Sequence, residues 1–460
     1  MARPNILFIL ADDLAWNDLD CYGARQAETP QIDRLAAQGM RFTQAYAAAP
    51  ICSPSRAALL TGRSPARLGL EFVTKNPGAT VNATGLPLEP PPFSPGLALE
   101  EITFAEVLQK SGYRTGFYGK WHVAQHYGVY LGWSPTHGPK QQGFDEAEED
   151  FGGHSYGALA KAPLQGPETS DGEFPPDSMA DKAIAFLERN KDRPFCLMVS
   201  HFFVHDPVKA PARWLFEKAR RKAKVNSDKA AAYVAFVETL DHHVGRLLSA
   251  LDRLGLSGNT LVVFTSDNGG APGYLERAPL RGSKWTLYEA GLRVPFIARW
   301  PGVIAPNRVA DAPIIGSDIF PTFCEVGGAR MNVAALDGLS LAPLLRGKRP
   351  TQFDQRELVW HFPYYNPEPP KQGVRRPVLA DPPPGTLFTP VSAIRRGRYK
   401  LLRHYENNQN ELYDLASDPK EQHDLAKTRR SLARSMRARL DAKLRSLKAR
   451  FPIENTNFQK

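Results

Sequence analysis

Three continuous apolar runs constrain the fold of this chain more than any other feature. They lie in residues 5–10, 195–203 and 261–265, and the second is apolar without interruption as far as Val199, after which Ser200 and His201 follow. A strand that is apolar on both faces is buried on both faces, which is typical of the centre of a mostly parallel sheet. Helical patterns at residues 178–190 and 233–254 separate the runs. The sequence therefore predicts an α/β protein with a large, mostly parallel sheet flanked by helices.

After residue 350 the pattern changes to short strands. They are expected at residues 357–362, 392–396, 399–403 and 411–415, and a basic amphipathic helix follows them. Short strands joined by tight turns indicate an antiparallel sheet. A chain of 460 residues also exceeds what one hydrophobic core usually serves. We therefore predict a large N-terminal domain over residues 1–350, which would carry any active site at the ends of the apolar strands, and a smaller C-terminal antiparallel α+β domain over residues 351–460, with a terminal helix.

Acidic and amide side chains follow two of the apolar runs. Asp12 and Asp13 come after the first run, and Asp267 and Asn268 come after the third. Ligands of open α/β sheets gather at the carboxyl ends of strands. Adjacent carboxylates repel one another unless a cation lies between them, and oxygen ligands suit Ca²⁺ or Mg²⁺. Each pair alone also fits a solvated turn, but together they predict a cation site.

The segment Cys52-Ser53-Pro54-Ser55-Arg56 leads into a run with good helix propensity that stops at Gly62. Pro54 suits a first helical turn, so we expect Cys52 just before the helix N-terminus. The helix dipole and Arg56 would favour an anion there. The same segment, taken alone, also describes a buried cysteine beside a helix cap.

Further cations and imidazoles follow other predicted strands. Lys120 and His122 follow the strand expected at 113–118, and a cation and an imidazole so placed can contact one bound anion. His205 precedes Asp-Pro after the second apolar run, with His201 nearby. The other histidines of the loop and helix segments show no ligand pattern and are expected at the surface: His126, His137, His154, His242 and His243.

Several of these segments resemble the type I (formylglycine-dependent) sulfatases of the alkaline phosphatase superfamily, including the arylsulfatases and N-acetylgalactosamine sulfatases. Cys52-x-Pro-x-Arg56 matches the family signature, and Thr61-Gly62-Arg63 matches its continuation. The resemblance runs in family order from residue 5 to about 425 and includes Gly119-Lys120-x-His122 and the segment 280–295 with Lys284. Ser283 and Trp285 depart from the family pattern, which has glycine and a small residue at these positions in many members.

The resemblance implies an alkaline-phosphatase-like fold and hydrolysis of sulfate monoesters. Cys52 would be oxidised to formylglycine by a formylglycine-generating enzyme, and the aldehyde hydrate would attack sulfur. The implied metal ligands, for Ca²⁺ with Mg²⁺ as the alternative, are Asp12, Asp13, Asp267, Asn268 and modified Cys52. The implied catalytic residues are Cys52, Arg56, Lys120, His122, His205 and Lys284.

The resemblance also suggests roles for these residues. Arg56 would steady the hydrate, and Lys120 and Lys284 would bind sulfate oxygens. His122 is the candidate base, while His205, together with Lys284, is the candidate donor to the leaving oxygen. His201 is taken as a core or supporting residue.

The substrate depends on loops that follow no simple rule, at about 73–100, 123–175 and 363–390. Their polar, aromatic and histidine-bearing composition favours an exo-acting sulfatase of glycosaminoglycans or sulfated polysaccharides over a steroid or aryl sulfatase. A phosphonate or phosphate monoester hydrolase on the same scaffold is an alternative. So is a non-catalytic sulfoglycan-binding protein, if Cys52 stays unmodified.

Charge and hydropathy exclude other partners. The chain has 58 basic and 48 acidic residues, a net charge of +10, but its basic residues concentrate at 429–450 without an aromatic platform. We therefore expect no nucleic-acid partner. No apolar run reaches the length of a membrane span. The start of the chain has no signal-peptide pattern, which predicts a cytoplasmic protein, or a periplasmic or extracellular one whose leader has been trimmed.

Overall fold

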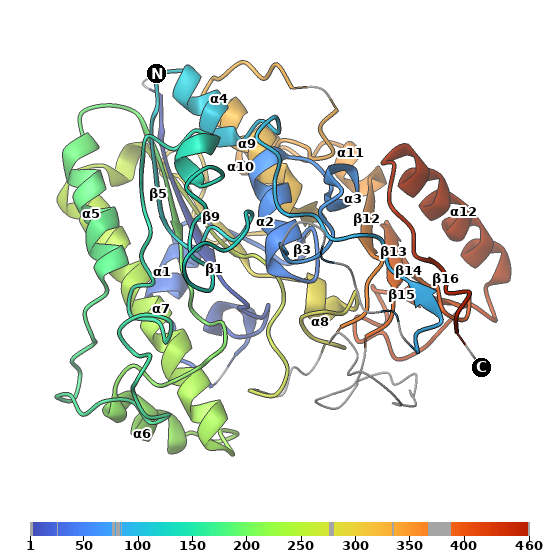
Figure 1. The fold of residues 1–460 in the computed structure, drawn as a ribbon. Coiled ribbons are helices and arrows are strands. Elements are labelled where there is room, and N and C mark those ends of the chain that lie inside the picture. The colour runs from blue at the N-terminus through green and yellow to red at the C-terminus, as the bar shows by residue number, and fades with distance from the viewer. Residues whose placement is uncertain are drawn as a thin grey trace.

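The computed structural model describes residues 3–24, 26–75, 79, 83, 85–275, 280–333, 335–366 and 388–458. Its largest element is an eight-stranded sheet with the order β10-β2-β9-β8-β1-β7-β5-β6 (Figure 1). The strands are β1 (Asn5–Ala11), β2 (Met40–Phe42), β5 (Arg114–Gly119), β6 (Glu146–Glu148), β7 (Phe195–Ser200), β8 (Thr260–Ser266), β9 (Phe296–Arg299) and β10 (Arg308–Ala310). The three apolar runs are therefore the adjacent central strands β8, β1 and β7, as predicted.

The centre of this sheet is parallel, and its β8 side is mixed. β1 pairs in parallel with β7 and β8, and β5 pairs in parallel with β7 and β6. β9 runs antiparallel to both of its neighbours, β8 and β2. The predicted α/β class is confirmed, with an antiparallel insertion that the apolar runs do not reveal. The second apolar run also ends as a strand at Ser200 rather than at residue 203.

Both faces of the sheet are buried because alternate side chains of β1 enter different cores. Leu7 and Ile9 pack into one core, and Ile6 and Phe8 into the other. Helices of the first core are α1 (Pro30–Ala37), α5 (Ser178–Asn190), α6 (Arg213–Arg220) and α7 (Asp228–Arg253). Helices of the second core are α2 (Cys52–Thr61), α4 (Phe104–Lys110), α9 (Ile319–Val326) and α10 (Ala342–Leu345). Figure 1 shows the two groups on opposite sides of the sheet.

Capping side chains explain where several helices begin. Asp177 accepts a hydrogen bond from the Ala180 N–H at the start of α5, and Ser227 accepts one from Ala230 at the start of α7. Thr103 and Glu106 form a capping box at α4. α2 begins at Cys52 itself, so the expectation that Cys52 precedes the helix was wrong by one position.

The C-terminal region forms a four-stranded antiparallel sheet, as predicted. It comprises β12 (Glu357–Phe362), β13 (Val391–Arg396), β14 (Tyr399–His404) and β15 (Asn410–Asp414). Helix α12 (Arg430–Ser446) covers one face through Leu440 and Leu444 (Figure 1). The domain division at residues 350 and 351 stays a prediction, and most of the predicted loop 363–390 lies outside the described residues.

Short elements connect these parts. They are β3 (Ala45–Tyr46) paired with β11 (Ile314–Ile315), β4 (Leu88–Glu89) paired with β16 (Ile453–Glu454), α3 (Pro65–Leu68), α8 (Glu289–Leu292), α11 (Gln352–Gln355), and the 3₁₀ turns Asp20–Tyr22, Pro139–Gln142, Ser257–Asn259 and Gly316–Asp318. Within the described residues, every helix is too short or too polar to cross a lipid bilayer.

Candidate active site

The register of the central strands brings the predicted site residues to one edge of the sheet. Leu10 of β1 is level with Ser200 of β7, and Ala11 is level with Ser266 of β8. β5 ends beside Ser200 as well. The residues that follow these strands therefore meet, and α2 and the loop before α8 bring Cys52, Arg56 and Lys284 to them. All ten predicted residues converge here: Asp12, Asp13, Cys52, Arg56, Lys120, His122, His205, Asp267, Asn268 and Lys284.

Three carboxylates and three cations pair at the floor of this site. Lys120 Nζ lies 2.5 Å from Asp12 Oδ2, and Lys284 Nζ lies 2.6 Å from Asp13 Oδ2. Arg56 Nε lies 2.8 Å from Asp267 Oδ2. All six side chains are buried. The charges of the six side chains balance, so a divalent cation would make the site positive.

Arg56 is also held by neutral acceptors. Its Nη1 donates to the Lys120 carbonyl and to Ser200 Oγ, both at 2.7 Å. These bonds fix the guanidinium against the ends of β5 and β7. Ser200 was not predicted as a site residue. Its position at the carboxyl end of a central strand is the sequence feature from which it could have been predicted.

Cys52 lies at the centre of the charged cluster. Its thiol donates to Asp12 Oδ1 at 3.5 Å, and Lys120 Nζ lies 3.5 Å from Sγ. Burial raises the pKa of the Cys52 thiol far above its ordinary value, although Lys120 and Lys284 oppose the shift. The encoded cysteine is therefore a neutral thiol, and a thiol is a weak nucleophile.

The pKa values of two carboxyl groups diverge. Burial acts to raise the pKa of Asp13, but Lys284, His205 and Lys120 together bring it well below its usual range. Burial, followed by the nearby charge of Asp12, raises the pKa of Asp267 to about 6, against the opposing effect of Arg56. The two pKa values differ because several positive groups surround Asp13, whereas Asp267 lies next to the negative charge of Asp12.

The donor set fits a hard divalent cation. Ligand atoms of Asp12, Asp13, Cys52 and His205 lie within 4.8 Å of one another. Asn268 Oδ1 is buried and has no hydrogen-bond partner among the described residues, while its Nδ2 donates to Asp13 Oδ1 at 2.7 Å. A buried acceptor without a donor is the environment that a cation satisfies, and carboxylate and amide oxygens suit Ca²⁺ or Mg²⁺.

Both predicted site histidines are uncharged near neutral pH. Burial and the charges of Lys284 and Lys120 lower the pKa of His205 to about 3. Burial and Lys120 lower the pKa of His122 well below its usual value. His122 Nδ1 is buried without a hydrogen-bond partner in the described part of the chain. A neutral imidazole with an unoccupied nitrogen can accept a proton.

Three residues around the site adopt left-handed backbone conformations that side chains other than glycine rarely adopt. The φ angles are 62° at Asp13, 54° at His122 and 79° at Trp285. Such strain persists where surrounding contacts enforce it, and it is concentrated at functional sites.

Gly119, at φ 102°, allows the close approach of two strand ends, because a Cβ atom there would lie 2.1 Å from the Ser200 carbonyl oxygen.

A cavity of about 390 Å³ opens above Cys52. His122, His205 and Lys284 line it, and His201 does not. Its lining also includes Trp285 and six residues of the two loops, 73–100 and 123–175, from which substrate contacts are expected: Val73, Thr74, Lys75, Ala79, His126 and Tyr130. His126 lies between His122 and Tyr130, with ring centroids 5.4 and 4.8 Å away. The sequence indicated these loops, but it has no periodic pattern that shows which of their residues line the cavity.

Two histidines expected at the surface are buried, so that prediction was wrong. His154 is fully buried, and its Nε2 lies 2.8 Å from the His205 carbonyl oxygen. His243 is buried in α7 with Nε2 3.8 Å from Asp177. His154 packs against Phe203 and Phe236, so the loop that carries it covers α7 and the end of β7. Their burial depends on segments far away in the sequence.

Comparisons with known proteins agree with this geometry. The sulfatase family model matches residues 4–329, and the model of the N-sulphoglucosamine sulphohydrolase C-terminal region matches residues 283–377. Human arylsulfatase A is 35% identical over 447 residues, which span 90% of this chain and 77% of that protein. Dog N-acetylgalactosamine-6-sulfatase is 36% identical over 375 residues, or 75% of this chain and 66% of that protein.

Solved structures share the whole fold. The crystal structure of Ps i-CgsB in complex with k-i-k-neocarrahexaose superimposes with a TM-score of 0.75 at 26% identity, covering 99% of this chain and 95% of that one. Both the matched family model and the human relative extend over most of the chain. The protein is therefore a member of the sulfatase family, with the alkaline-phosphatase-like fold, and is a sulfuric ester hydrolase.

Proposed function

We propose that this sulfatase removes sulfate from carbohydrates in an exo-acting manner, using formylglycine made from Cys52. The observation that carries the proposal is the position of Cys52 Sγ, 3.5 Å from both Asp12 Oδ1 and Lys120 Nζ, below a cavity that two histidines and Lys284 line. The high pKa of the thiol argues against cysteine itself as the nucleophile. Oxidation by a formylglycine-generating enzyme would supply a hydrated aldehyde, with one hydroxyl to attack sulfur and another whose deprotonation expels sulfate.

The surrounding side chains are suited to the charge that develops during transfer. Lys120 and Lys284 would donate to the nonbridging sulfate oxygens, where negative charge accumulates. Arg56 stays protonated and would steady residue 52 from the α2 side. His122 would accept a proton from residue 52, because its imidazole is neutral. Lys284, and the N–H of the neutral His205 imidazole, would donate hydrogen bonds to the oxygen of the leaving alcohol.

Four residues would hold Ca²⁺, or alternatively Mg²⁺: Asp12, Asp13, Asp267 and Asn268, with residue 52 beside them. The Asn268 Oδ1, which has no hydrogen-bond partner within the described ranges, supports this assignment. The ion would supply positive charge to the sulfate group. Asp12 and Asp13 would then be shared between the ion and the two lysines that now contact them.

The shape and composition of the cavity support a sugar sulfate as the substrate. Its floor is charged, whereas Tyr130 at its mouth contacts His126 and Tyr156 edge-on, with ring centroids 4.8 and 5.6 Å apart. Aromatic faces next to polar groups suit a sugar, which has apolar C–H faces and polar hydroxyls. A cavity of about 390 Å³ has room for one terminal sugar, which supports the exo-acting manner of the proposal.

The proposal is tested on the tryptic peptide that spans residues 42–56. Protein produced with a formylglycine-generating enzyme should show a peptide mass lower by about 18 Da than the cysteine form. Sulfate release from a sulfated monosaccharide should rise with the converted fraction. Full activity of wholly unconverted protein would disprove the formylglycine mechanism.

Metal removal gives a separate test of the four oxygen ligands. Dialysis against EDTA should lower kcat by about 100-fold or more, and Ca²⁺ or Mg²⁺ should restore it. Retention of full kcat after removal of all divalent metal, verified by elemental analysis, would contradict the cation site.

Parallel assays with phosphate and phosphonate monoesters measure the alternative activity. Faster release of phosphate or phosphonate from these esters than of sulfate from any sulfate ester would reverse the substrate assignment.

A further inference from the structure

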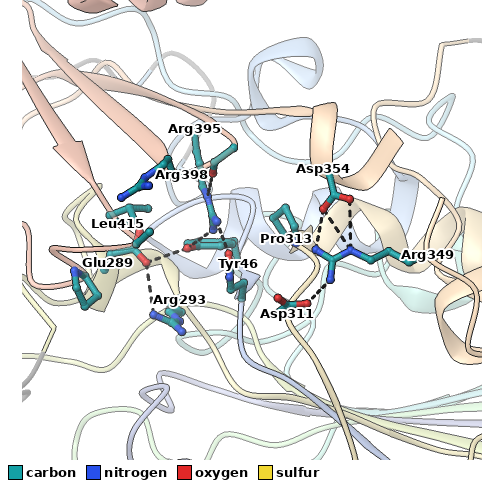
Figure 2. Close-up of a pocket in the computed structure, with 14 residues that line it drawn as sticks. Tyr46, Glu289, Arg293, Asp311, Pro313, Arg349, Asp354, Arg395, Arg398 and Leu415 are labelled. Carbon is teal, nitrogen blue, oxygen red and sulfur yellow. Dashed lines mark hydrogen bonds and ion pairs between the residues drawn. The ribbon is translucent and has the colours of Figure 1, made fainter. Parts of the chain in front are cut away.

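A second cavity, of about 330 Å³, lies in the seam between the large sheet region and the C-terminal sheet (Figure 2). It is bordered by the start of β3, by α8, and by the turn between β13 and β14. Four arginines line it: Arg293, Arg349, Arg395 and Arg398. The residues of the candidate active site take no part in its wall. We call this the seam cavity.

The arginines at the mouth of the seam cavity have carboxylate partners. Arg349 pairs with Asp311 and Asp354, and Figure 2 shows these three as a separate group on one side. Arg398 Nε lies 2.6 Å from Asp414 Oδ1. About half of each of these two arginine side chains is exposed. These two arginines thus face three carboxylates, and the mouth has no excess positive charge.

Arg395 on the floor is different. It is 6% exposed, and it donates to the Gly397 carbonyl, the Tyr46 hydroxyl and Gln44 Oε1, all of which are neutral. It forms no ion pair with a carboxylate of the described residues. A guanidinium has five N–H groups, so two remain after these three bonds. A buried charge without an opposite charge in contact is unfavourable.

Arg293 adds a second incompletely paired guanidinium. Its Nε donates to the Thr43 carbonyl at 2.7 Å, and its Nη1 lies 3.9 Å from Glu289 Oε2. Glu289 is already engaged, because it accepts hydrogen bonds from Tyr46 at 2.8 Å and from Lys400 at 3.0 Å. Figure 2 shows Arg395, Tyr46, Glu289 and Arg293 as one connected row.

Positive charge therefore exceeds negative charge around the floor. The cations are Arg293, Arg395 and Lys400, and the carboxylates are Glu289 and Glu421. Burial raises the pKa of Glu421 to about 7, although Lys400 opposes the shift. The excess is one positive charge with Glu421 ionised, and two with Glu421 protonated.

We propose that the seam cavity binds an oxyanion of the sulfate class, either free sulfate or the sulfate group of a sugar sulfate. The remaining N–H groups of Arg395 and Arg293 donate to its oxygens. Planar guanidinium groups match such oxygens in paired hydrogen bonds. The volume exceeds that of a sulfate ion, so a sugar attached to the sulfate also fits. This site is independent of the formylglycine mechanism.

The first experiment locates the anion directly. Crystals of the intact protein are soaked in selenate, and anomalous scattering from selenium is mapped. We expect one peak beside Arg395 and Arg293, distinct from any peak near Cys52. An empty seam cavity at a selenate concentration that fills the active site would overturn the proposal.

The second experiment measures binding in solution by calorimetric titration with sodium sulfate. Arg395→Lys keeps the charge but loses the paired donors, and should weaken one binding site about tenfold, with kcat on an aryl sulfate unchanged. Arg349→Gln is the matched control, because Asp311 and Asp354 already neutralise Arg349, and should alter affinity less than twofold. If Arg395→Lys does not fold, Arg293→Lys should still weaken the site about threefold, because the second incompletely paired guanidinium is lost.

The outcomes separate the possible sources of the anion. Cys52→Ala protein, which should not hydrolyse sulfate esters, is titrated with glucose 6-sulfate. The affinity of the site that is sensitive to Arg395 for this sugar sulfate is then compared with its affinity for inorganic sulfate. A selenate peak without any solution site sensitive to Arg395 would mean an adventitious ion only, and would overturn the proposal. Equal weakening by Arg349→Gln and Arg395→Lys would overturn it as well.

Discussion

Two buried clusters of charge lie in different parts of this molecule. The active-site cluster pairs Asp12, Asp13 and Asp267 with Lys120, Lys284 and Arg56. The seam cluster contains Glu289 and Glu421 with Arg293, Arg395 and Lys400. In the first, each carboxylate has its own cation. In the second, two carboxylates share three cations.

The comparison teaches that buried charge alone does not mark a catalytic site. The active-site cluster surrounds a thiol, two neutral imidazoles and a buried amide oxygen without a partner. The seam cluster joins elements far apart in the sequence, since Lys400 of β14 reaches Glu289 of α8 at 3.0 Å. The first cluster combines several chemistries at the ends of strands, whereas the second connects two sheets.

The largest expected effect comes from replacing one lysine in each cluster. Lys284→Met should lower kcat by about 100- to 1,000-fold in a folded protein, because a donor to the transferring sulfate is lost. Lys400→Met should leave Glu289 and Glu421 without their shared ammonium and should destabilise the fold by about 3–5 kcal/mol, with kcat of the folded fraction nearly unchanged. Steady-state kinetics and urea unfolding measure the two effects. Equal losses of kcat in both variants would remove the distinction between the clusters.

A moderate effect is expected in the pH dependence of stability. The folded-state pKa of Glu421, about 7, lies above its ordinary value of 4.5. Between these values the folded chain binds more protons than the unfolded chain, so the contribution of Glu421 to stability, present below pH 4.5, is lost as the pH rises to 7. Glu421→Gln should remove this decline, which amounts to roughly 1–3 kcal/mol.

Urea unfolding at several pH values between 4.5 and 8 measures this change, and Glu188→Gln on the surface should behave like wild type. Parallel curves for wild type and Glu421→Gln would show that the seam carboxyl does not titrate in this range. The seam would then resemble the active-site cluster, where Asp13 is held ionised.

The smallest effect concerns the mouths of the two cavities. Tyr130 lies at the mouth of the active-site cavity, whereas charged side chains surround the mouth of the seam cavity. Tyr130→Ala should lower kcat/KM for a sulfated oligosaccharide up to about tenfold, because one aromatic contact is worth 0.5–1.5 kcal/mol. Tyr127→Ala, in the same loop but outside the cavity lining, is the control. A loss as large for Tyr127→Ala would argue against a specific contact at Tyr130.

The sequence by itself determined the central sheet and the members of the candidate site. Apolar runs identify β1, β7 and β8 because a strand buried on both faces must be apolar throughout. Asp12, Lys120 and Asp267 directly follow strands, so the parallel order of the sheet brings them to one edge. The grouping of these residues therefore follows from local patterns and one topological rule.

Only the tertiary structure decided which other side chains join the site and how the two sheets meet. His205 lines the cavity and His201 does not, yet both follow β7 within five residues. His154 and His243 are buried because distant segments cover them. The seam cavity is built from side chains as far apart as Tyr46 and Arg395. Burial and charge pairing between remote segments depend on how the helices and strands pack. A local sequence pattern does not predict that packing.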